Sequence, residues 1–177
     1  NSVLSLVLTL ASPIGITSAK AQSNEPIVRR IEDVTIASIF VAVSPVEAWN
    51  VIRDYEETGL KMPDIKKARI ISREGNNVKI KQTYAASYTF GLKIESLLEI
   101  EEKSKSMLNY KLLHGDFIHT LEGNWILIPV SGGTLVAHRI KIEPAIPGIL
   151  KPLFINRFEA NMKDSMVILR RIILESQ

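Results

Sequence analysis

The feature that most constrains the fold is a series of short β-rich segments followed by one long amphipathic segment at the end of the chain. Only two to five residues separate these segments, as in residues 74–77, and such short turns join antiparallel neighbours. The sequence therefore predicts an antiparallel sheet in which consecutive strands pair. The β-rich segments are 68–73, 78–85, 88–101, 107–113, 118–128 and 134–142.

Alternation within the segments assigns their side chains to two faces. Val78, Ile80, Gln82 and Tyr84 share one face, and lysines occupy much of the other. The segment 88–101 has the same pattern. One face of the sheet is thus apolar and expected to be buried, and we call it the dry face. In the segment 88–101 the side chains predicted for the dry face are Tyr88, Phe90, Leu92, Ile94, Leu98 and Ile100. A sheet with one dry and one wet face needs another element to cover the dry one.

Residues 149–174 are predicted to form the helix that covers this face. The segment contains no glycine, and Pro152 lies in the first turn, where proline is tolerated. Large apolar residues recur every three or four positions and form one stripe. The stripe consists of Leu150, Phe154, Phe158, Met162, Met166, Leu169 and Ile173. Such a helix is about 37 Å long and could cross a sheet of six or seven strands.

The part of the chain before residue 64 predicts one strand and two short helices. Residues 29–43 are rich in β-branched side chains and lack Gly and Pro, which favours one long strand that is bent or bulged. Residues 44–47 read Ser-Pro-Val-Glu, a capping box with proline at the first helical position. A helix is predicted from Pro45 to about Tyr55. Gly59 and Pro63 restrict the residues after this helix to a second short helix or a loop.

Residues 1–22 are predicted to be a secretory signal peptide that is truncated at its start. Residues 3–10 are an apolar run too short to span a membrane, and a small-x-small site predicts cleavage after Ala21. The chain starts at Asn1, so the charged beginning of the precursor is expected to be missing. The alternative is an apolar arm that packs on the domain or on a neighbour. With cleavage, residues 23–177 form a single soluble domain exported to the periplasm or an equivalent lumen.

Composition excludes several classes of site. The 177 residues include no cysteine, so disulfides, thiolate zinc sites, iron–sulfur clusters and cysteine nucleophiles are excluded. The net charge is only +3, and basic and acidic residues are interleaved, so no nucleic-acid partner is expected. None of the common hydrolase, nucleotide-binding or zinc motifs is present. We therefore predict no cofactor, no metal and no catalytic residue set.

Five short motifs in order resemble a known family. They are residues 43–49 (VSPVEAW), 62–65 (MPDI), 121–125 (LEGNW), 129–134 and 144–152. From about residue 31 to 174 the sequence resembles the polyketide cyclase/dehydrase and coenzyme Q-binding START-like branch of the SRPBCC superfamily. That branch is related in fold to START lipid-transfer domains and birch-pollen-allergen proteins. The resemblance implies an α+β helix-grip fold, with a curved antiparallel sheet of six to seven strands around a long C-terminal helix. It also implies two short helices after the first strand, and an apolar cavity for lipids, polyketides, quinones or sterols.

Alternate positions along a strand share a face, and we call this strand parity. Strand parity and the helical stripe together indicate candidate cavity residues, which either line a pocket or fill it. His138 shares a face with Val136 and Ile140, and His119 with Leu121. Each histidine either orients a ligand or transfers a proton, or is a buried side chain bonded to a tyrosine or a carbonyl group. The candidate residues are Gln82, Tyr84, Tyr88, Phe90, Tyr110, His119, Trp125, His138, Phe154, Phe158 and Met162.

Three functions remain open from the sequence. The first is binding or carriage of a hydrophobic small molecule, such as a lipid, an isoprenoid or quinone, or a polyketide-like compound. The second is a cyclase/dehydrase-like or hydrolytic enzyme that uses His119 or His138 with Tyr84 or Tyr110. The third is a protein-interaction module at a membrane complex, which a filled cavity would favour.

The apolar segment 146–154 is predicted to form either a lid over the cavity or an apolar edge that contacts a membrane surface transiently. Arg157 is placed to meet a ligand headgroup, to pair with Glu159 or to be solvated. The sequence predicts no particular oligomeric state.

Overall fold

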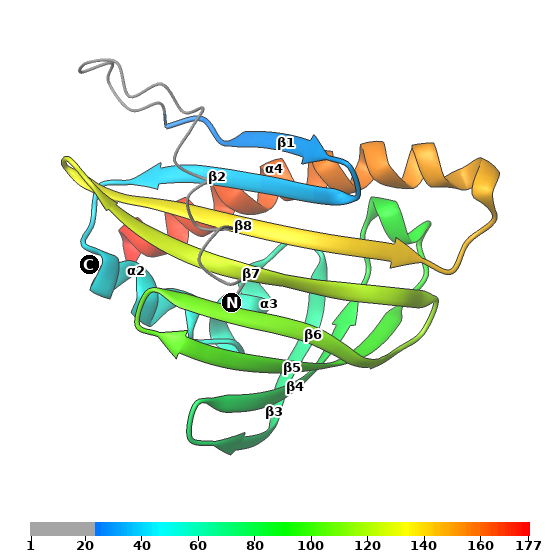
Figure 1. The fold of residues 1–177 in the computed structure, drawn as a ribbon, viewed down its shortest axis with the longest axis horizontal. Coiled ribbons are helices and arrows are strands. Elements are labelled where there is room, and N and C mark those ends of the chain that lie inside the picture. Colours follow the sequence, from blue (N-terminus) through cyan, green and yellow to red (C-terminus); the bar gives the residue numbers. More distant parts are fainter. Residues whose placement is uncertain (1–23) are drawn as a thin grey trace, which may run out of the picture.

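Eight antiparallel strands form one curved sheet that wraps around a long C-terminal helix (Figure 1). The computed structural model describes residues 24–177, so the predicted signal peptide and its cleavage site lie outside the described residues. The strand order across the sheet is β1-β2-β8-β7-β6-β5-β4-β3. The strands are β1 (Ile27–Ile31), β2 (Val34–Val41), β3 (Ile65–Glu74), β4 (Asn77–Tyr84), β5 (Ile94–Ser104), β6 (Met107–Gly115), β7 (Ile118–Val130) and β8 (Gly133–Pro144).

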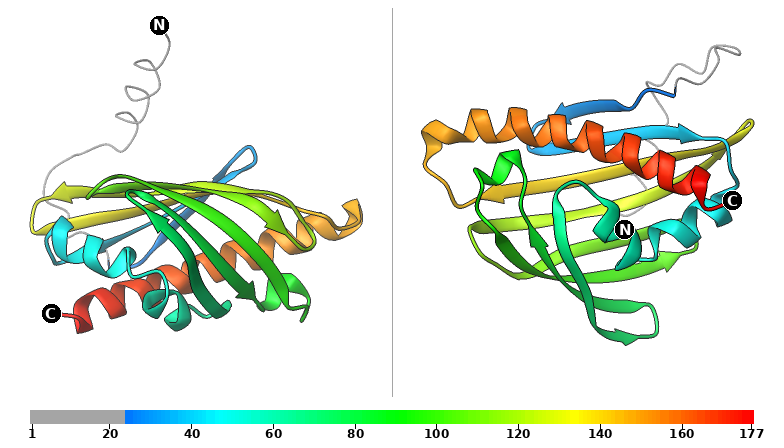
Figure 2. Two further views of the ribbon diagram at one scale, coloured as in Figure 1. Left: turned by 90° about the horizontal axis from the view of Figure 1, so that it is seen from below. Right: turned by 180° about the vertical axis from the view of Figure 1, so that it is seen from behind.

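The helices lie on the concave side of the sheet, as Figure 2 shows. Two short helices, α2 (Pro45–Ile52) and α3 (Glu57–Lys61), follow the first two strands. The long helix α4 (Lys151–Glu175) ends the chain after a short 3₁₀ turn, η2 (Gly148–Leu150). This arrangement is the predicted helix-grip fold, which is confirmed, with eight strands in place of the six or seven expected.

The additional strand comes from the segment predicted as one long strand, residues 29–43. It forms a hairpin in which β1 pairs with β2 and Ile31 lies opposite Val34. Glu32, in the two-residue turn, has a φ of 55°, in the left-handed region that non-glycine residues seldom occupy. The prediction of a single strand was wrong because the turn contains none of the Gly or Asn residues that signal a hairpin.

A second difference lies before β5, where the strand was predicted to begin at Tyr88. Residues Ser87–Thr89 instead form a 3₁₀ turn, η1, and the strand begins at Ile94. Phe90 and Gly91 follow η1 with φ values of 55° and 81°. The Thr89 hydroxyl bonds to the carbonyl groups of Ala86 and Leu92, at 2.9 and 2.8 Å, and so stabilises this turn. Residues 86–92 therefore form a loop at the end of the sheet.

The capping box and the apolar stripe are both confirmed. The Glu47 backbone N–H donates to Ser44 Oγ at 3.3 Å, and the Ser44 N–H donates to Glu47 Oε2 at 2.7 Å. Helix α2 ends three residues earlier than expected, at Ile52. In α4 the buried residues follow the stripe, except that Leu150 precedes the helix. They are Phe154, Phe158, Met162, Met166, Leu169, Ile172 and Ile173.

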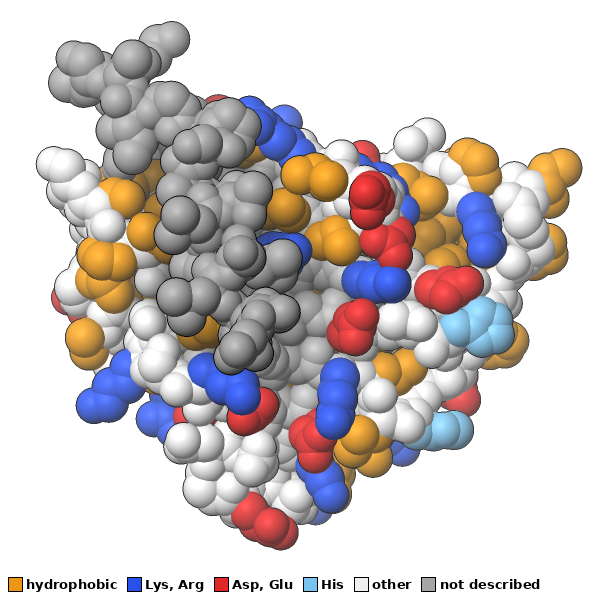
Figure 3. All heavy atoms as spheres, viewed as in Figure 1, with side chains coloured by type: hydrophobic (Ala, Val, Ile, Leu, Met, Phe, Trp, Pro, Cys, Tyr) orange, Lys and Arg blue, Asp and Glu red, His pale blue; other side chains and the backbone are white. Residues whose placement is uncertain are grey.

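Where Figure 3 leaves the outer face of the sheet visible, side chains of both charges are interleaved there, with apolar side chains among them. Cross-strand ion pairs such as Lys81–Glu95 (2.7 Å) and Lys111–Glu99 (2.9 Å) join neighbouring strands on this face. The dry face therefore turns toward α4. Within residues 24–177, no helix combines the length and the apolar character needed to cross a bilayer.

Candidate functional site

The sheet and α4 enclose a cavity of about 240 Å³. Its wall is mostly aliphatic and aromatic and is contributed by β4 to β8, α4, the loop 86–92 and the segment from the end of α2 to the start of β3. Ten of the eleven predicted cavity residues line it, although their role in ligand binding stays a prediction. They are Gln82, Tyr84, Tyr88, Phe90, Tyr110, Trp125, His138, Phe154, Phe158 and Met162.

His119 is the exception, and its predicted place in the cavity was wrong. Ile118 pairs with Pro144, and Thr120 pairs with Glu143, so two steps along β7 correspond to one step along β8. His119 is the extra residue of this β-bulge, and its side chain is exposed. A bulge reverses the inward and outward alternation, so parity counted through the bulge placed His119 on the wrong face.

His138 lies at the centre of an aromatic cluster on the sheet side of the cavity. Its Nε2 is 2.7 Å from Tyr110 Oη, and its ring stacks on the Trp125 ring at 3.9 Å with an angle of 7°. Burial lowers the pKa of His138 to about 3 and raises the pKa of Tyr110 well above its ordinary value. At neutral pH both groups are uncharged, and the imidazole is bonded to a tyrosine.

Gly123 makes room for this cluster. It lies directly opposite Tyr110 in the β6–β7 pair. A Cβ atom at Gly123 would lie 2.5 Å from Tyr110 Oη and 2.1 Å from the Arg139 carbonyl oxygen. The absence of a side chain therefore lets the phenol cross β7 and reach His138. The 121–125 motif contains this glycine, but its role requires the cross-strand register.

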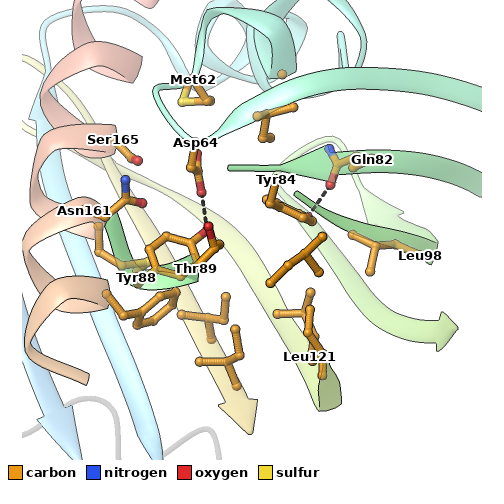
Figure 4. A pocket seen from close by; sticks show the side chains of 18 of the residues that line it. Met62, Asp64, Gln82, Tyr84, Tyr88, Thr89, Leu98, Leu121, Asn161 and Ser165 are labelled. Atoms are coloured by element: carbon orange, nitrogen blue, oxygen red, sulfur yellow. Dashed lines mark hydrogen bonds between the residues drawn. The ribbon is translucent and has the colours of Figure 1, made fainter. Parts of the chain in front are cut away.

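A second polar group lies where β3 begins, on the opposite side of the cavity. Tyr88 Oη donates a hydrogen bond of 2.7 Å to Asp64 Oδ2 (Figure 4). The Tyr88 ring meets Phe154 and Phe158 edge-on, with ring centroids 5.7 and 5.4 Å away. Burial raises the pKa of the Asp64 carboxyl group and of Tyr88. Tyr88 thus connects the loop 86–92, helix α4 and Asp64.

Asn161 and Ser165 extend from α4 toward Asp64 (Figure 4). They are four positions apart and so share a helix face. The sequence reasoning missed Asp64, Asn161 and Ser165. A signal was available for the pair on α4, since residues 161 and 165 each precede a residue of the apolar stripe and so lie at its edge.

A buried charged cluster closes the cavity near α2. Tyr55 lines the cavity, and its hydroxyl group donates to Glu102 Oε1 at 2.8 Å. The same carboxylate binds Arg73 at 3.0 Å and Arg53 at 3.3 Å. Glu102 is only 7% exposed. The sequence reasoning did not single out this residue.

These features place the chain among known proteins. The profile of the family described as polyketide cyclase / dehydrase and lipid transport matches residues 41–167. The chain belongs to this family. No curated protein sequence matches the chain. A Thermus thermophilus protein of this fold has 21% identity and a TM-score of 0.72, with 81% of this chain and 99% of that chain covered.

Two other solved structures show the breadth of this fold. The ZhuI aromatase/cyclase from a Streptomyces species has 13% identity and a TM-score of 0.65, covering 85% of this chain and 94% of that one. A STAR-related lipid transfer protein from Xanthomonas axonopodis has 15% identity and a TM-score of 0.64, covering 88% and 97%. At these identities the structural likeness shows the fold alone.

Arg157 holds the loop 86–92 against α4. Its guanidinium donates to the Ser87 carbonyl oxygen at 3.0 Å and lies 5.2 Å from the centre of the Phe90 ring. No ion pair joins Arg157 to Glu159 in the described part of the chain, so that predicted alternative was wrong, whereas the guanidinium remains partly exposed to solvent. Phe90 and Leu92 line the cavity and are also exposed, so this loop forms part of the rim.

The rest of the rim is apolar. Phe117 also lines the cavity and is exposed, and Ile149, just before α4, is 88% exposed. Leu150 and Leu153 are exposed beside it. Within residues 24–177, no three His, Asp or Glu side chains gather in a way that could hold a metal ion.

The low pKa of His138 predicts that acid destabilises this family member. Below pH ~6.5 the unfolded chain takes up a proton at this residue and the folded chain does not, so lowering the pH favours unfolding. We expect His138 to contribute up to about 1.4 kcal/mol per pH unit to this slope between pH ~6 and ~4. The measurement is the free energy of unfolding against pH. His138→Gln should flatten the curve, whereas His119→Gln, at an exposed position, should not.

Proposed function

We propose that this protein binds or carries a hydrophobic small molecule in the cavity between the sheet and α4. The observation that carries this proposal is the cavity itself, which is lined almost wholly by apolar and aromatic side chains. Burial of ten methylene groups would contribute roughly 8 kcal/mol before ordering costs. Few polar contacts are therefore needed for useful affinity. The lipid, isoprenoid or quinone, and polyketide classes all fit this description.

The histidine geometry supports binding over acid–base catalysis. A general acid or base works best with a pKa near the operating pH, and the pKa of His138 lies far below neutrality. His119 lies outside the cavity, so it has no access to a ligand there. An unfilled cavity also favours a ligand-binding protein over a pure protein-interaction module.

Export to the periplasm or an equivalent lumen, and transient contact with a membrane surface, belong to the same proposal. Export rests on the sequence of residues 1–22 alone. Membrane contact is supported by the exposed apolar side chains of the rim, including Ile149 and Phe117. A rim of this kind would allow an apolar ligand to pass between a bilayer and the cavity with little exposure to water.

A cavity-filling substitution tests the proposal. Met162 is buried and lines the cavity, so Met162→Trp should occupy the ligand's space while keeping the residue apolar. We expect at least a tenfold drop in the ligand retained by protein isolated from cells that export it. The measurement is native mass spectrometry followed by solvent extraction. Val167→Trp is the matched control, because Val167 is exposed on the same helix.

Two results would contradict the proposal. One is a folded Met162→Trp protein that retains as much ligand as the unsubstituted protein. The other is unsubstituted protein that retains no apolar compound and binds none when apolar compounds are added.

A further inference from the structure

The charges on the cavity wall are unbalanced. Among the residues that the structure describes, those lining the cavity include one carboxyl side chain, Asp64, and no lysine or arginine. His138 supplies no positive charge at neutral pH, because burial holds its pKa at about 3. Arg157 is directed to Ser87 and Phe90 and does not line the cavity. An anionic headgroup inside the cavity would therefore meet a carboxyl group and no cation.

The corner around Asp64 also has unused hydrogen-bonding groups. Tyr88 donates to Asp64 Oδ2, the backbone N–H of Asp64 also bonds to this carboxyl group, and no second side chain in the described part of the protein donates to it. Within that same part, the Asn161 amide and the Ser165 hydroxyl group make no side-chain hydrogen bond. Both project from α4 toward Asp64 (Figure 4). Acceptors and donors from opposite walls thus converge on one corner of an apolar cavity.

We propose that this cavity selects an uncharged apolar molecule that carries a hydroxyl group, and that Asp64, Asn161 and Ser165 bind this hydroxyl group. The inference rests on the proposed function and specifies its ligand class. The ligand hydroxyl donates to the Asp64 carboxyl group, which receives one side-chain hydrogen bond, and accepts from the amide of Asn161. The apolar body extends from this corner along α4, past Met162, toward the aromatic cluster at His138.

The same groups discriminate against related headgroups. A hydroxyl group buried without hydrogen-bond partners weakens binding, and this corner supplies the partners. A carboxylate or phosphate would be desolvated beside Asp64 without a compensating cation, which is more unfavourable than burial of a neutral group. Fatty acids and phospholipids are therefore expected to bind more weakly than alcohols with the same apolar body.

The test compares three probes with one chain length: 1-dodecanol, dodecanoate and dodecylamine. Isothermal titration calorimetry at neutral pH on the full chain measures each dissociation constant. We expect 1-dodecanol to bind at least about tenfold more tightly than dodecanoate. Asp64→Asn keeps an acceptor for Tyr88 and removes the carboxyl group, so it should reduce this preference to below about threefold. Asn161→Ala should weaken dodecanol binding, whereas Asn156→Ala, exposed on the same helix, should not.

The outcomes separate the two proposals. Dodecanoate binding as tightly as dodecanol would overturn the hydroxyl selection and leave the proposed function intact. Dodecylamine binding most tightly would likewise overturn it, by showing that Asp64 recognises a cation. Absence of binding by all three probes would overturn the proposed function, and this inference with it. An unchanged preference in folded Asp64→Asn would remove Asp64 from the site.

Discussion

Gly123→Ala is expected to lower the free energy of unfolding by at least about 3 kcal/mol, at the upper end of what overpacking produces. The new methyl group would lie 2.1 Å from the Arg139 carbonyl oxygen and 2.5 Å from Tyr110 Oη. The carbonyl oxygen belongs to the backbone of β8, the strand paired with β7, and cannot move away without disrupting that pairing. The phenol of Tyr110 is held at His138. Both strands must shift to accommodate one added carbon.

The measurement is urea-induced unfolding followed by tryptophan fluorescence. Gly148→Ala is the control, because a Cβ atom at Gly148 meets no heavy atom within 4 Å. We expect it to change the free energy of unfolding by less than about 0.5 kcal/mol. A Gly123→Ala protein within about 1 kcal/mol of the unsubstituted protein would contradict the proposed role of Gly123.

Glu102→Gln is expected to lower the free energy of unfolding by about 3 kcal/mol. The buried carboxylate accepts hydrogen bonds from Tyr55 and Arg73 and forms an ion pair with Arg53. A glutamine side chain retains one acceptor oxygen and adds an NH₂ group, which faces the same donors. Removal of one partner from a buried charge network leaves groups unpaired, and such changes cost about 3–5 kcal/mol. We use the lower value because the Arg53 and Arg73 side chains are 44% and 34% exposed and can be rehydrated.

The neighbouring residue supplies the control for this substitution. Glu101 faces the opposite side of β5, and its carboxylate pairs with Lys103 at the surface. Surface pairs contribute little to stability, so Glu101→Gln should change the free energy of unfolding by less than about 1 kcal/mol. Thermal and urea unfolding of the two variants would test the contrast. Equal effects from Glu101→Gln and Glu102→Gln would show that the buried cluster does not stabilise this end of the cavity.

Much of the candidate site could be predicted from strand parity and helical periodicity. Parity placed Gln82, Tyr84 and His138 on the dry face, and all three line the cavity. It failed at His119 because one bulge in β7 changes the count. It could not indicate that residues 86–92 form a loop, since the left-handed conformation of Phe90 is unusual for a non-glycine residue.

The partners in the polar contacts of the site could not be identified from the sequence, although a tyrosine was one of the two partners expected for a buried histidine. Asp64 and Tyr88 are 24 positions apart, and Tyr110 and His138 are 28 apart. Neither pair has a spacing signal, because each is brought together by strand pairing and by the curvature of the sheet. The same is true of Glu102, which lies on the dry face of β5 and is stabilised there by side chains from α2 and β3.

The class of fold follows from the sequence pattern alone. Alternation along the strands created one dry face, and the apolar stripe of α4 was the element able to cover it, so burial of apolar surface favoured a sheet around a helix. Which polar groups bond to one another at the cavity depends on the tertiary structure. The effects of the strand register, of the bulge at His119 and of the small size of Gly123 all depend on how neighbouring strands pair. They result from the packing of distant residues, and local propensity and periodicity carry no information about them.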